Sequence, residues 1–113
     1  MTVSEALDPA FSALDAAEAD LGKLDATCCD PGRSPRMAAL ASTLAEARTQ
    51  LDRVRTTPLA AADAILRLED AGAQIGRLQI GCCAPKRLPL YARMLENLTT
   101  AQLTLNSATG HAH

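Results

Sequence analysis

The sequence predicts an all-α protein: an antiparallel up-down-up-down four-helix bundle built from two duplicated helical hairpins that are related by a pseudo-two-fold axis. Composition is the first reason, because the 113 residues include one Phe, one Tyr and no Trp, whereas the helix formers Ala and Leu are abundant. Apolar residues also recur at spacings of three and four, which is typical of amphipathic helices. The third reason is that the second half of the sequence repeats the first.

The repeat is clearest in two loops that contain all four cysteines. CCDPGRSP at residues 28–35 and CCAPKRLP at residues 82–89 share the frame Cys-Cys-x-Pro-x-Arg-x-Pro. We call the shift that takes Cys28 to Cys82 the repeat offset. The same offset aligns residues of the flanking segments: Leu14 with Leu68, Ala17 with Ala71, Gly22 with Gly76, Leu44 with Leu98 and Ala47 with Ala101. An internal duplication is the simplest explanation of this pattern.

The chain is long enough for one domain with a modest core. We expect this single domain to span residues 1–113 and to contain repeat units of approximately residues 4–54 and 58–108. The tail over residues 108–113 has no apolar stripe, so we expect it to be disordered.

The first two helices are expected over residues 9–27 and 35–56, after an N-terminal segment that forms a short extra turn or frays. Asp8-Pro9 and Ser34-Pro35 mark their starts, because Pro suits the first turn of a helix and the residue before it can cap the free N–H groups. Their apolar stripes include Leu14, Ala17, Leu21 and Leu24 in the first helix and Leu40, Leu44, Ala47 and Leu51 in the second.

The last two helices are expected over residues 58–80 and 89–107. Thr57-Pro58 marks the start of the third helix, and Leu88-Pro89, with a poorer cap, marks the start of the fourth. Their stripes include Leu68, Ala71, Ile75 and Leu78 in the third helix and Tyr91, Met94, Leu98 and Leu105 in the fourth.

The short link over residues 55–58 predicts the topology, because it forces the second and third helices to run antiparallel. In an up-down-up-down bundle the first and third connections lie at the same end. We therefore expect the two cysteine loops to meet there and to bring four thiols together.

The candidate metal ligands are Cys28, Cys29, Cys82 and Cys83. Four thiolates suit an iron–sulfur cluster or a zinc or copper ion, and adjacent cysteines, which point apart in extended backbone, fit a large cluster or a multinuclear copper(I) site better than a single ion. Arg33 and Arg87 are the candidate charge partners of this cofactor site. Gly22 and Gly76 would either leave room for a cluster or permit close helix packing.

The same loops have other interpretations. Disulfides such as Cys28 with Cys82 would join the two hairpins, and their reduction and oxidation would make a thiol switch. Both residues also continue the apolar stripes of their helices, which is typical of cysteines that only pack. Arg33 and Arg87 would alternatively bind an oxyanion beside helix N-termini.

These residues favour a small metal- or iron–sulfur-binding protein with a role in storage, sensing or electron transfer. They favour a binding role over an enzymatic one without deciding between them. The alternative is a thiol- or disulfide-responsive helical interaction module without a cofactor. A homodimer and a redox or other protein partner are the candidate partners. The candidate dimer surface consists of leucines beside the main stripes: Leu59, Leu66, Leu90 and Leu95.

Several function classes are not expected. The net charge of −2 gives no electrostatic footprint for nucleic acid, and no apolar run approaches the roughly 20 residues that a membrane-spanning helix needs. The N-terminus lacks a basic region and an apolar signal core, so we expect a cytoplasmic protein with reduced thiols. The only histidines are His111 and His113 in the tail, which leaves no Ser/His/Asp or Cys/His constellation for hydrolysis.

Overall fold

The structure is a computed structural model that describes residues 3–27, 35–78 and 84–109. Every regular element in these ranges is helical, and no strand occurs among them, so the predicted all-α class is confirmed. The elements in chain order are α1 (Val3–Ala6), α2 (Asp8–Thr27), α3 (Pro35–Val54), the 3₁₀ helix η1 (Pro58–Ala60), α4 (Ala61–Leu78) and α5 (Ala84–Thr109).

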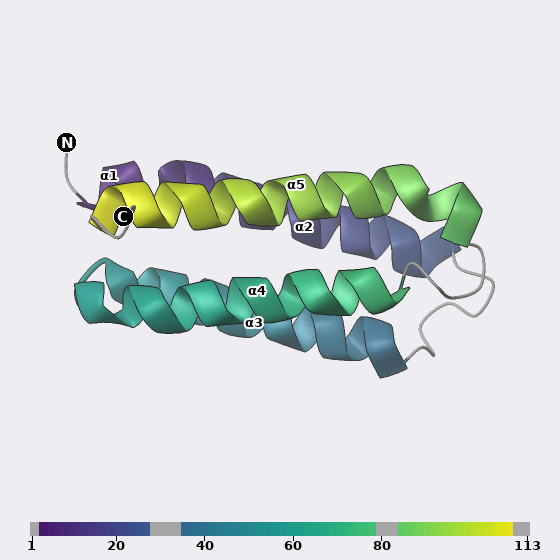
Figure 1. Cartoon of the computed structure of the whole chain (residues 1–113), viewed down its shortest axis with the longest axis horizontal. Helices are drawn as coiled ribbons and strands as arrows, with labels where there is room; N and C mark the ends of the chain where they lie inside the picture. Colours follow the sequence, from purple (N-terminus) through teal and green to yellow (C-terminus); the bar gives the residue numbers. More distant parts are fainter. Residues whose placement is uncertain (1–2, 28–34, 79–83, 110–113) are drawn as a thin grey trace.

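The four long helices lie along one axis and form a body of 44 × 21 × 21 Å (Figure 1). Helix α2 packs most extensively on α5, α3 packs most extensively on α4, and α4 also contacts α5. In Figure 1 the C-terminal ends of α2 and α4 and the N-terminal ends of α3 and α5 gather at one end, whereas α1, η1 and the C-terminal end of α5 lie at the other.

One hydrophobic cluster runs through the middle of all four long helices. Leu14, Leu44, Leu68 and Leu98 are all buried in it, and Tyr91 is its only fully buried aromatic side chain among the residues described. The apolar stripes therefore face inward as the 3.6-residue period requires. Because the core consists mainly of Leu and Ala, the helices pack through small and aliphatic side chains.

Helix α5 begins earlier than the sequence analysis predicts, at Ala84 instead of Pro89, so the proposed cap at Leu88 is wrong. The duplicated loops differ at two informative positions: Gly32 and Ser34 of the first copy are Lys86 and Leu88 in the second. Gly and Ser favour a break and a cap, whereas Lys and Leu favour a helix. The helix therefore extends upstream past Pro89, and α5 changes direction near its N-terminal end (Figure 1).

The other boundaries differ less from the prediction. Pro58 begins the 3₁₀ helix η1 that leads into α4, and Thr57 makes no side-chain capping bond. The expected extra turn at the N-terminus is α1. The C-terminal tail was expected to be disordered from residue 108, but α5 continues through Thr109, whose hydroxyl donates to the Leu105 carbonyl at 2.8 Å.

Polar contacts link neighbouring helices outside the core. Arg48 of α3 forms ion pairs with Asp15 and Glu18 of α2. Hydrogen bonding to Glu18 makes the largest contribution to a raised pKa of Arg48, against the opposing effect of partial burial. The Arg55 guanidinium lies 4.3 Å from the centre of the Phe11 ring, so Phe11 is covered by a cation instead of entering the core fully.

None of the described helices combines the length and the apolar character that crossing a membrane requires.

Candidate functional site

The predicted metal ligands Cys28, Cys29, Cys82 and Cys83 lie outside the residues that the structure describes, as does Arg33. Arg87 belongs to α5, but its side chain is outside the description as well. The structure therefore describes the four helix ends to which the two cysteine loops are attached, and we call these ends the platform.

The platform consists of four helix ends. Helix α2 ends at Thr27, directly before Cys28, and α4 ends at Leu78, four positions before Cys82. Helix α3 begins at Pro35, the last residue of the first frame, and α5 begins at Ala84, directly after the second cysteine pair. Figure 1 shows these four ends at the same end of the molecule. The N-termini of α3 and α5 carry partial positive charge and the C-termini of α2 and α4 partial negative charge, so the dipoles partly cancel there.

The inner side of the platform is apolar. In the described part of each long helix, the buried residue nearest this end is Leu24, Met37, Leu78 or Tyr91, and these four form a layer of the core. The Tyr91 hydroxyl donates a hydrogen bond to the Leu78 carbonyl at 3.3 Å, which satisfies one of the carbonyls at the C-terminus of α4. This layer separates the helix ends from the rest of the core.

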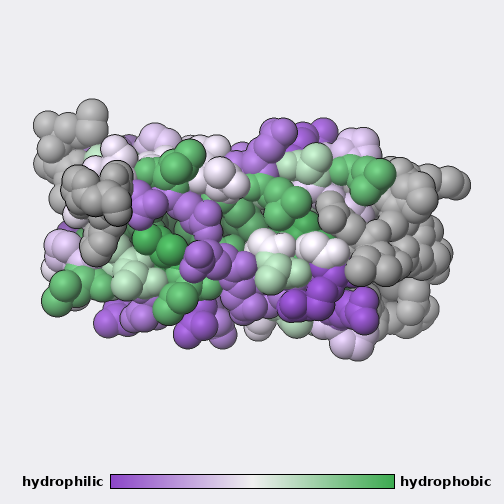
Figure 2. All heavy atoms as spheres, in the orientation of Figure 1, coloured by the Kyte–Doolittle hydropathy of each residue, from purple (hydrophilic) through white to green (hydrophobic). Residues whose placement is uncertain are grey.

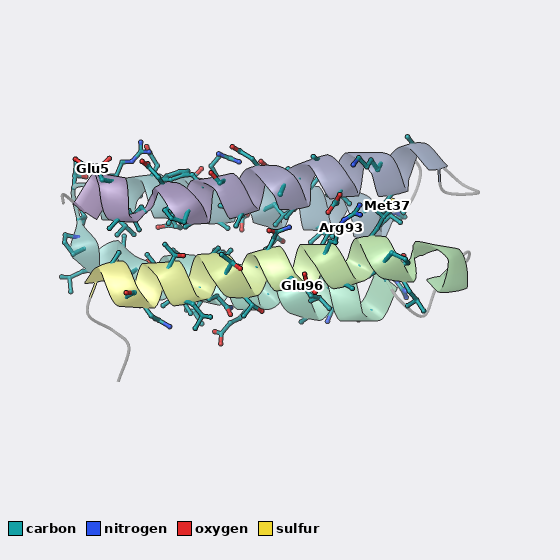
Figure 3. The ribbon with its side chains drawn as sticks, turned by 90° about the horizontal axis from the view of Figure 1, so that it is seen from above. Glu5, Met37, Arg93 and Glu96 are labelled. Atoms are coloured by element: carbon teal, nitrogen blue, oxygen red, sulfur yellow. The ribbon has the colours of Figure 1, made fainter. Side chains whose placement is uncertain are left out.

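A buried carboxylate lies beside this layer. Asp20 of α2 is only 6% exposed, and its two carboxylate oxygens accept hydrogen bonds from Arg93 of α5 at 3.1 and 3.3 Å. Lys23 lies 3.9 Å from the same carboxylate. In Figure 3 the Arg93 side chain reaches from α5 toward α2. The hydrogen bond to Asp20 raises the pKa of Arg93, with attraction between the charges as the second cause.

Two consecutive hydrogen bonds join α4 to α3. The Gln74 amide nitrogen donates to the Thr43 hydroxyl at 2.7 Å, and this hydroxyl donates to the Ala39 carbonyl at 3.0 Å. The sequence analysis did not identify Asp20, Arg93 or Gln74. The available signal was a polar residue four positions before a leucine near the end of α2 and of α4: Asp20 before Leu24 and Gln74 before Leu78.

The two glycines before the cysteine loops are not sites of close helix packing. A Cβ atom built at Gly22 or Gly76 would have no neighbouring atom within 4 Å among the residues described, the backbone of its own helix aside. Only Gly72 approaches another helix in the described ranges, at 3.9 Å from a methyl carbon of Leu95. The packing interpretation of Gly22 and Gly76 is therefore wrong, and no described residue fills the space beside either glycine.

Replacing either glycine by alanine is expected to stabilise the protein. Because helical Gly costs about 1 kcal/mol relative to Ala, Gly22→Ala and Gly76→Ala should each raise the free energy of unfolding by up to that amount. Urea denaturation followed by circular dichroism measures the change. Ala73→Gly, at an exposed position of α4, is the matched control and should lower stability similarly. A loss of stability in the alanine variants would show that this space is occupied in solution.

No group of three or more His, Cys, Asp or Glu side chains within the described ranges is arranged to hold a metal ion. Comparisons with known proteins add no further assignment: no family model matches the chain, and neither the curated proteins nor the solved structures contain a significant match. The function must therefore be argued from the chain's own residues.

Proposed function

We propose that the chain binds a metal ion or an iron–sulfur cluster through Cys28, Cys29, Cys82 and Cys83. The observation that supports this proposal is the gathering of four helix ends at one end of the molecule, because both cysteine loops are attached to those ends (Figure 1). Thiolates are soft ligands that suit iron–sulfur clusters, zinc and copper(I). Storage, sensing and electron transfer are the roles consistent with such a site.

The proposal includes a fold with internal symmetry: an antiparallel up-down-up-down bundle of two duplicated hairpins. Residues one repeat offset apart have matching environments, since the pairs Leu14 with Leu68, Met37 with Tyr91, Leu40 with Met94, Leu44 with Leu98 and Leu51 with Leu105 are all buried. The polar links also correspond, because Asp20 joins α2 to α5 and Gln74, its counterpart, joins α4 to α3. In such a bundle each thiol pair has an equivalent in the other hairpin.

Arg33 and Arg87 complete the proposed site as charge partners. Both occur at the same place in the repeated frame, shortly after the two cysteines. Positive charge near a thiolate lowers the thiol pKa and offsets the negative charge of a metal–thiolate complex.

The test is elemental analysis and absorption spectroscopy of protein purified without oxygen, with a free-thiol count on the same sample. We expect iron with visible absorption bands, or zinc or copper at a fixed ratio to protein, together with thiols that resist alkylation until a chelator is added. A colourless, metal-free sample would contradict the proposal.

The alternative function, a thiol- or disulfide-responsive interaction module, is favoured by one observation. Hydrophobic side chains gather on the face that α4 and α5 present in Figure 2. The exposed large hydrophobic residues of the described chain all belong to η1, α4 or α5: Leu59, Leu66, Leu88 and Leu103. The equivalent positions of the first repeat carry polar residues: Glu5, Ser12, Ser34 and Thr49. The second half of the chain therefore has an apolar surface that the first half lacks at these positions.

This surface differs from the predicted one, because Leu90 and Leu95 are half-buried against the core and only Leu59 and Leu66 are exposed. A homodimer through this face is the corresponding assembly. Sedimentation of the protein as purified, with its metal content measured on the same sample, separates the two functions. A metal-free dimer that dissociates when its disulfides are reduced would support the module, and a monomer with bound metal would support the cofactor protein.

A further inference from the structure

Helix α5 has a stripe of exposed residues on the face that points away from the core. Its members recur every three or four positions, so they lie on one face of the helix: Leu88, Ala92, Glu96, Thr99, Leu103 and Ser107. Leu88 and Leu103 are large apolar side chains at 50% and 64% exposure, and Glu96 is the only charged member. The stripe follows rows of residues four positions apart, which form the ridges that interdigitate when two helices cross. It is therefore suited to contact with a helix of another chain.

A groove of about 600 Å³ lies beside the C-terminal part of α5, where α1 packs against this helix (Figure 1). The described residues that line it are mostly small or apolar: Glu5, Ala6, Pro9, Leu103, Thr104, Ser107 and Ala108. Leu103 and Ser107 belong to both the groove and the stripe. The size and the apolar lining of the groove suit a leucine side chain from another chain, whose burial there is favourable.

Leu88 and the groove lie at corresponding distances from the two ends of α5. Leu88 is four positions after Ala84, where the helix begins, and Leu105 is four positions before Thr109, where it ends. Residues 103–108, which include the groove lining of α5, are centred near Leu105. Two copies of α5 that pair antiparallel with complete overlap therefore bring Leu88 of each copy to the level of the groove of the other. This match makes the surface self-complementary, as a two-fold interface requires.

The charges beside the two ends of α5 are also complementary in this arrangement. The first ten residues of α5 include Lys86, Arg87 and Arg93 and no acid, and the helix N-terminus adds partial positive charge. At the other end, α1 and the start of α2 supply Glu5 and Asp8 beside the groove. Antiparallel pairing brings the basic end of α5 in one copy next to these carboxylates in the other, whereas parallel pairing would place like charges together.

We propose that two copies of the chain form an antiparallel dimer through α5, in which Leu88 of each copy occupies the groove of the other. A long side of the bundle measures 44 × 21 Å, and a stable interface takes about 800 Å² from each partner, so the contact needs nearly the full length of this side. Complete overlap of the 26-residue α5, about 39 Å long, supplies that length. The helix ends that carry the cysteine loops then lie at opposite ends of the dimer. Pairing needs neither a disulfide nor a metal and goes beyond both functions proposed above.

Glu96 opposes this dimer. It lies next to the midpoint of α5, so complete overlap brings the Glu96 carboxylates of the two copies close to each other. Like charges that face each other across an interface weaken association, although solvent at the exposed stripe screens part of the repulsion. The apolar contacts of Leu88 and Leu103 outweigh this cost. A two-fold axis near Glu96 therefore predicts that neutralising this residue strengthens the dimer.

The test is sedimentation equilibrium of the full chain as purified, with a reductant present and over a wide range of concentration. A reversible equilibrium between monomer and dimer is expected. Leu88→Ser and Leu103→Thr introduce the residues that the first repeat has at these positions. Each should raise the dissociation constant at least about tenfold, because every dimer loses two buried leucines. Glu96→Gln should lower the dissociation constant by about threefold, because the repulsion between the two carboxylates is removed.

The matched control is Leu66→Ser, because Leu66 is an exposed leucine of α4 outside the proposed contact and its repeat equivalent is Ser12. This variant should dimerise as the unaltered protein does, and circular dichroism establishes that each variant is folded. In a mixture of isotope-labelled and unlabelled chains, nuclear Overhauser effects between chains should join the methyl groups of Leu88 and Ala108.

Four outcomes would each overturn the proposal: a monomer at every concentration, a dimer that dissociates on reduction, an equal weakening by Leu66→Ser, or contact between the Leu88 side chains of the two copies. The metal content of the same sample tests the proposed function separately, so failure of the dimer and failure of the metal site are distinguished.

Discussion

Leu44→Ala and Leu98→Ala are each expected to lower the free energy of unfolding by about 2–5 kcal/mol, and by similar amounts. Both side chains are buried in the middle of the bundle, at 0% and 3% exposure, where truncation leaves a cavity that the surrounding helices fill poorly. The core is thin, with one fully buried aromatic residue among those described, and domains of this size are stable by only about 5–15 kcal/mol. Either change therefore removes a large share of the total.

Urea denaturation followed by circular dichroism measures both variants. Leu66→Ala is the control, because Leu66 is 57% exposed and its truncation should change stability by no more than about 0.5 kcal/mol. Leu44 and Leu98 occupy equivalent positions of the two repeats, so the proposed duplication requires comparable costs. A large cost at one position and a negligible cost at the other would contradict the equivalence of the two hairpins.

Cys28→Ser and Cys82→Ser are expected to remove most of the bound metal, and to do so equally. Serine replaces the thiolate by a hydroxyl that stays protonated at neutral pH and is a poor ligand for soft metals. If both loops contribute to one site, either substitution leaves it incomplete. The metal-to-protein ratio after purification without oxygen is the measurement.

Ser42→Ala, at an exposed position of α3, is the control for this pair and should keep the metal content of the unaltered protein. Metal loss from only one of the two cysteine variants would show that the site belongs to a single loop. Unchanged metal content in both would remove Cys28 and Cys82 from the ligand set.

Local sequence signals were sufficient for most helix boundaries. The start of α3 at Pro35 and the end of α2 at Thr27 agree with the prediction, because a proline and an apolar stripe act within one helix. The start of α5 was missed because Pro89 was interpreted by analogy with Pro35. The residues that make Pro35 a start, Gly32 and Ser34, are absent from the second copy.

The sequence alone also identified the candidate metal ligands and their candidate charge partners. All four thiols and both loop arginines occur in one repeated frame, so their identity and spacing are evident without coordinates. The ion pair between Asp20 and Arg93, near the same end of the bundle, was not evident from the sequence. Asp20 and Arg93 are 73 residues apart, and nothing in their local surroundings indicates that they pair.

The sequence by itself determined that the chain is helical, because helix propensity and the 3.6-residue period act over a few residues along one helix. Only the tertiary structure decided which helix faces meet and which polar groups of the described chain remain without a partner. Whether Asp20 meets Arg93, and whether Oε1 of Gln74 is left without a donor, depends on the rotation and separation of two packed helices. Those quantities are set by the fit of side chains from every helix in the core, and no single segment encodes them.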